Sequence, residues 1–96
     1  MTQEELRAKL ESYDLKGATM EELISDRDSA RDMYWKCSSR HSLVYNNVRD
    51  TVYGTAEVDY ARTELLSAIR LEAEIYYYHA SRLGSEILAR LSKMDE

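Results

Sequence analysis

The sequence predicts an all-α domain: an antiparallel helical hairpin of two long helices, with a short N-terminal helix that makes it three-helix bundle-like. The 96 residues include no proline and only three glycines, whereas strand-rich domains need many turn-forming residues. Good helix formers such as Ala, Leu, Glu and Arg are frequent. Apolar residues recur at steps of three and four, the period of an amphipathic helix. We therefore expect a single helical domain over residues 1–96.

The first predicted helix covers about residues 2–13. Thr2 and Glu5 have the spacing of a capping box, in which the Thr side chain accepts from the amide three residues on and the Glu side chain reaches back. Gly17 is the predicted end of this unit, because glycine readily adopts the left-handed conformation that caps many helices.

The second predicted helix covers about residues 19–53. Thr19 and Glu22 repeat the capping-box spacing at its start. An apolar stripe then continues along one face to the end of the helix. Its weakest stretch is 38–47, where Ser-Ser and Asn-Asn pairs can break or bend a helix.

The third predicted helix covers about residues 56–94 and follows a turn at Gly54, with Thr55 as its cap. Its main apolar stripe has the repeat of a nearly straight helix. Two long helices joined at Gly54 make the hairpin, and the first helix folds back near its open end.

A second apolar patch on the third helix predicts a binding partner. Projected at about 100° per residue, Ala68, Leu71, Ile75 and Tyr78 cluster opposite the main stripe. The second helix covers only one face, and the hairpin places the short first helix at the far end. We therefore expect another protein, or a second copy of this chain, to cover the patch. The alternative is that the first helix packs higher and buries it.

The aromatic composition supports the same prediction. The chain has eight tyrosines and no phenylalanine, and a buried tyrosine hydroxyl needs a hydrogen-bond partner, whereas tyrosine is favoured at interfaces. The three consecutive tyrosines at 76–78 cannot all face one core. The predicted partner-binding residues are Ala68, Leu71, Ile75, Tyr77 and Tyr78.

The sequence offers little catalytic or metal-binding chemistry. Cys37 and His41 lie four residues apart on one helix face, and Glu72 is the only plausible helper at their level. His79 lies about 18 Å away along the hairpin, from the rise per residue. We therefore predict no enzyme activity, no metal and no cofactor. If His41 is buried between the helices, its protonation near pH 6 would weaken the packing.

Composition narrows the classes of partner and location. The net charge is −5, and the basic residues of the second helix alternate with acidic ones, so nucleic-acid binding is the least favoured function. One cysteine excludes a disulfide-stapled domain. The start of the sequence has no signal-peptide pattern, and no stretch is apolar enough to span a membrane. We therefore expect a cytoplasmic location, with secretion by a route that needs no signal peptide as the alternative.

The length, acidity and hairpin layout resemble the WXG100 family of secreted helical hairpins. That family carries Trp-x-Gly at its turn, whereas this turn reads Tyr53-Gly54 and Trp35 lies within the second helix. The segment from Leu71 to His79 is similar to small helical chaperones of type III secretion systems over about ten residues. Neither resemblance assigns the chain to a family.

These observations predict a non-enzymatic protein–protein interaction module. An adaptor, a secretion chaperone and a phage-type inhibitor of a host protein all fit the predicted surface, as would other bacterial accessory proteins. A homo-oligomer that uses the same face of the third helix is the alternative. A nucleic-acid-binding protein that uses Arg27, Arg31, Lys36 and Arg40 is a third possibility and predicts steeply salt-dependent binding.

Overall fold

The computed structural model describes residues 2–50 and 56–94, and the side chains within them except those of 47–50 and 56–61. Three helices and no strand are found in these ranges: α1 (Gln3–Glu11), α2 (Met20–Asp50) and α3 (Ala56–Met94). The predicted all-α hairpin with a short N-terminal helix is therefore confirmed. The predicted turn at Gly54 and cap at Thr55 lie outside the described residues.

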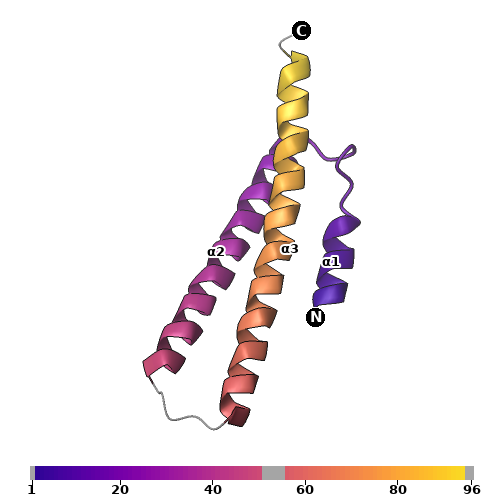
Figure 1. The fold of residues 1–96 in the computed structure, drawn as a ribbon. Helices are drawn as coiled ribbons and strands as arrows, with labels where there is room; N and C mark the ends of the chain where they lie inside the picture. The colour runs from indigo at the N-terminus through magenta and orange to yellow at the C-terminus, as the bar shows by residue number, and fades with distance from the viewer. Residues whose placement is uncertain (1, 51–55, 95–96) are drawn as a thin grey trace.

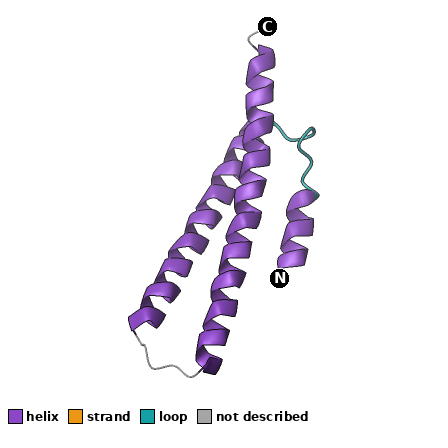
Figure 2. Cartoon of the chain, viewed as in Figure 1, coloured by secondary structure: helices purple, strands orange, loops and turns teal. Residues whose placement is uncertain are grey.

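The molecule is elongated, with extents of 62 × 23 × 16 Å. The long helices α2 and α3 run antiparallel, and α1 lies beside α3 and points in the same direction as α3 (Figure 1). The C-terminal end of α3 projects beyond the start of α2 (Figure 2). Among the described helices, α3 contacts both α1 and α2.

Two apolar clusters hold α2 against α3. Near the open end of the hairpin, Leu23 packs with Leu83 and Ile87, and the first two of these are fully buried. Farther toward the turn, Cys37 packs with Ile69 and Ala73. Burial weakens beyond the second cluster, where the exposed apolar side chains are Leu43, Tyr45 and Leu65. The predicted weak stretch 38–47 is nevertheless helical throughout.

The helix starts follow the predicted capping chemistry. The amide of Glu5 donates to Thr2 Oγ1 at 3.1 Å. At the start of α2 the exchange is reciprocal: Glu22 N donates to Thr19 Oγ1 at 3.1 Å, and Thr19 N donates to Glu22 Oε1 at 3.2 Å. These bonds satisfy amides that a helix leaves without an internal partner, which fixes where each helix begins.

The predicted left-handed cap at Gly17 is wrong. The helix ends earlier, at Glu11, with Ser12 as its C-cap, and Gly17 has no positive φ. Its amide instead donates to Asp14 Oδ1 at 3.0 Å, which forms a side-chain-closed turn. The reason is tertiary, because Tyr13 and its neighbours leave the helix to pack against the Leu23–Leu83–Ile87 cluster.

Arg90 of α3 holds the segment between α1 and α2 in place by hydrogen bonds. Its guanidinium donates to the carbonyl oxygens of Ala18 at 2.6 Å, Leu15 at 2.8 Å and Lys16 at 3.3 Å. Lys16 in turn pairs with Glu86 at 3.1 Å, one turn before Arg90 on α3. These contacts turn the chain back along the hairpin and so place α1 beside the middle of α3.

Candidate functional site

An exposed group of aromatic side chains spans α2 and α3. The Tyr34 ring lies 5.4 Å from Trp35 and 5.6 Å from Tyr77, measured between ring centroids, at interplanar angles of 69° and 52°. Tyr34 is half-buried against the Cys37–Ile69–Ala73 cluster. Trp35 and Tyr77 are 62% and 61% exposed. One anchored ring therefore orders two rings that face solvent.

These rings border a shallow hollow of about 290 Å³, here called the aromatic hollow; its lining residues are Arg31, Tyr34, Trp35, Tyr77, Ala80 and Ser81. No residue of α1 contributes to it. Tyr77 and His79 lie about 200° apart around α3, and His79 faces the segment that follows α1. The hollow therefore lies on the flank of the hairpin away from α1.

The only charged residue of the aromatic hollow is Arg31. Within the part of the chain that the structure describes, Arg31 makes no salt bridge, whereas neighbouring Arg27 pairs with Asp28 at 3.3 Å. The hollow thus combines apolar rings with one cation that forms no salt bridge to a described residue. It can accept an apolar group with a carboxylate beside it.

The structure separates the five residues predicted to bind a partner. Ala68 and Ile75 lie under α1: Gln3 Nε2 donates to the Ala68 carbonyl oxygen at 2.9 Å, and Ile75 is 6% exposed. Leu71, Tyr77 and Tyr78 remain exposed: Tyr77 lines the aromatic hollow, and Tyr78 lines a groove between α1 and α3.

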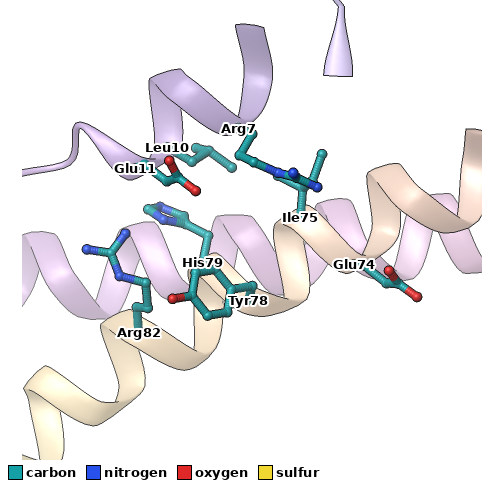
Figure 3. A pocket seen from close by; sticks show the side chains of 8 residues that line it. All are labelled: Arg7, Leu10, Glu11, Glu74, Ile75, Tyr78, His79 and Arg82. Atoms are coloured by element: carbon teal, nitrogen blue, oxygen red, sulfur yellow. The ribbon is translucent and has the colours of Figure 1, made fainter. Parts of the chain in front are cut away.

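The expectation that the first helix stays at the far end of the hairpin is wrong. The non-helical segment between Glu11 and Met20 lets the chain reverse, so that α1 lies beside α3 and runs in the same direction (Figure 1). The cover is partial and shallow. A groove of about 350 Å³ remains between α1 and α3, with Tyr78 and Arg82 on one side and Arg7 on the other (Figure 3).

The Cys37–His41 pair lacks the features of a reactive site. Burial is the main cause that raises the pKa of the Cys37 thiol, the negative charge of Glu72 adds to it, and Arg40 opposes it. The thiol is therefore held in its protonated, unreactive form. Glu72 is engaged by Arg40 at 3.2 Å. In residues 2–50 and 56–94, no three His, Cys, Asp or Glu side chains converge as metal ligands.

The buried histidine is His79, and His41 is half-exposed. His79 is 6% exposed, and its ring meets the edge of Tyr13 with centroids 5.4 Å apart. A signal for this burial existed in the sequence. His79 continues the stripe of Ala68 and Ile75 at steps of seven and four.

Comparisons of the chain with protein-family models, curated proteins and solved structures found no match. Among the described helices, none is long and apolar enough to cross a membrane.

Proposed function

We propose that the chain is a non-enzymatic protein-binding module whose aromatic hollow receives an apolar side chain of a partner protein. The observation that supports this function is the contact of Tyr34 with both Trp35 and Tyr77, two rings that remain about three-fifths exposed. Trp, Tyr and Arg are the residues most enriched at the energetic centres of protein interfaces. All three types line this one hollow.

The rings are ordered before any partner arrives. Tyr34 is held by the core and limits the rotamers of its neighbours, so little side-chain freedom remains to be lost on binding. Tyrosine and tryptophan have only two side-chain torsions, which lowers that loss further. An exposed, pre-ordered aromatic group favours binding over a purely structural role, since it contributes little to the core in its present state.

Charge indicates the chemistry of the partner. The chain carries a net charge of −5, which disfavours an acidic partner surface over most of the molecule. Arg31 is the local exception at the aromatic hollow. We therefore expect a segment with a large apolar side chain flanked by Asp or Glu. The buried lone thiol of Cys37 suits a cytoplasmic location, where cysteines stay reduced.

Selection from a random peptide library tests this function. We expect peptides with an acidic residue beside a large apolar one, and an affinity loss of about 30-fold for Trp35→Ala, the size of a typical hot-spot residue. Arg31→Glu should remove the preference for acidic residues. Leu43→Ala is the matched control, since Leu43 is a 63% exposed apolar residue of the same helix outside the hollow. Equal binding by the Trp35 and Leu43 variants would exclude the hollow as the site.

A second candidate function is self-association through α3. Toward its C-terminal end, which projects beyond the start of α2 (Figure 2), α3 has three exposed apolar side chains: Leu88 is 66% exposed, Leu91 45% and Met94 75%. A second copy would bury these side chains, which one chain leaves in water. Light scattering tests this: a dimer abolished by Leu88→Glu with Leu91→Glu places the interface there. A dimer abolished instead by Leu71→Glu with Tyr78→Glu places it on the predicted second face of α3.

A further inference from the structure

His79 lies where three segments meet. From α3 its ring points toward α1 (Figure 3) and packs on Tyr13, the second residue after α1. The Tyr13 hydroxyl donates to Asp26 of α2 at 2.5 Å. His79 is only 6% exposed, and its buried Nδ1 atom has no hydrogen-bond partner among the residues that the structure describes. This arrangement suits a neutral imidazole, because a buried charge without a partner is costly.

The contacts that dock α1 on α3 are few, so a single residue such as His79 can change whether α1 stays docked. No residue of α1 is buried, and a nine-residue helix has little stability of its own. Its attachment rests on the Gln3 bond to Ala68 and on apolar contacts of Leu10 and Tyr13 near Ile75 and His79.

Charged and titratable groups from every neighbouring element line the two pockets that His79 borders. They are Arg7 and Glu11 from α1, Tyr13 from the connecting segment, Asp26 from α2, and Glu74, Tyr78 and Arg82 from α3. Burial is the largest cause that lowers the pKa of His79, the positive charge of Arg82 adds to it, and Asp26 opposes both. Asp26 opposes only in part, since one of its oxygens already accepts from Tyr13.

We propose that His79 is a pH-sensitive latch, which holds α1 on α3 when neutral and releases α1 when protonated. Docking is complete above the ordinary histidine pKa of about 6.5 and weakens as the pH falls below it, because the released state then binds the proton more readily. Release uncovers Ala68 and Ile75. Together with exposed Leu71 and Tyr78, they make one continuous apolar stripe on α3.

The chain is well suited to a test, because it has only two histidines. Hydrogen exchange of residues 3–11 is measured at about pH 7.5 and pH 5.5 and corrected for intrinsic exchange rates. We expect the protection of α1 to fall by about threefold to tenfold in the wild type and in His41→Gln, the matched control. In His79→Gln the protection should be independent of pH. The amides around Leu83 serve as the reference, because they report on the core and should stay protected throughout.

A proton NMR titration of the two imidazoles checks the cause without any change at His79. We expect His79, identified by comparison with His41→Gln, to titrate below the ordinary histidine pKa of about 6.5. A pKa of His79 at or above that ordinary value, or equal protection of α1 at both pH values, would overturn the latch. Neither result bears on the aromatic hollow, since peptide binding there is measured on the opposite flank of the hairpin.

Discussion

Replacing Arg90 with Ala tests how the N-terminal segment is fixed. Arg90 makes two short hydrogen bonds to main-chain oxygens, to Ala18 at 2.6 Å and Leu15 at 2.8 Å, and it also pairs with Glu86 at 3.2 Å. Its side chain is 25% exposed, so solvent screens these contacts only in part. Removing the guanidinium leaves two carbonyl groups without their donor and loosens the segment that covers the Leu23–Leu83–Ile87 cluster.

The magnitude follows from these two bonds. A hydrogen bond to a charged group contributes about 1.5–3 kcal/mol, and the low end applies to a partly exposed side chain. Two such bonds give about 3 kcal/mol, and the longer bond to Lys16 is left out because it is exposed. A chain of this size has a free energy of unfolding of about 5–14 kcal/mol in total. The melting temperature should therefore fall by about 12 °C or more.

Urea denaturation followed by circular dichroism measures the loss, with Arg70→Ala as the matched control. Arg70 also lies on α3 and pairs with a Glu four residues away, at 3.5 Å, but its side chain is 76% exposed. It should contribute less than about 0.5 kcal/mol. Arg90→Lys keeps the positive charge but lacks the planar guanidinium that donates to two carbonyl groups at once. It should therefore recover about half of the lost free energy of unfolding. If Arg90→Ala costs no more than Arg70→Ala, the segment is not held by this side chain.

Three further changes probe the core, a helix position and a buried phenol. Leu83→Ala should cost about 2–5 kcal/mol in urea denaturation, because Leu83 is fully buried; a loss below about 1 kcal/mol contradicts the packing. Gly84→Ala should stabilise by about 0.5–1 kcal/mol, since the added methyl meets only Arg27 Cδ at 3.9 Å; destabilisation would reveal a tighter contact. Burial and the Asp26 carboxylate raise the pKa of Tyr13 to about 12, so stability should fall as the pH rises from about 10 toward 12. Tyr13→Phe should remove this fall, together with the phenol that titrates near pH 12 when ultraviolet absorbance is followed.

The helices could be predicted because their signals are local. Capping side chains three residues apart and apolar residues at helical spacing depend on neighbouring positions alone, and α3 coincides with the predicted range 56–94. The end of α1 could not be predicted in this way. It depends on Tyr13, which leaves the helix to reach Asp26, and on Arg90, which lies more than seventy residues away from Leu15 and Ala18.

The candidate site was predicted in part, for a related reason. Helical projection correctly separates the faces of α3. It places Tyr77 and Tyr78 outside the apolar stripe that packs against α2. It does not reveal which neighbour each face meets. Trp35 lies on α2, and only the register of the hairpin brings it into one group with Tyr34 and Tyr77. Likewise, the cover of Ile75 by α1 depends on a chain reversal that no periodicity encodes.

The position of α1 bears on which surface of α3 is available. A hairpin has two flanks, and a single short helix can cover only one of them. Here it covers the flank of Ala68, Ile75 and His79, which leaves Tyr77 to meet Tyr34 on the other. This division also accounts for the use of tyrosine over phenylalanine. A ring between a helix seam and solvent can bury its carbon atoms while its hydroxyl stays hydrated, as a phenylalanine in the same place cannot. The flank without α1 is therefore the one where an aromatic surface stays exposed to water, as the proposed partner-binding role requires.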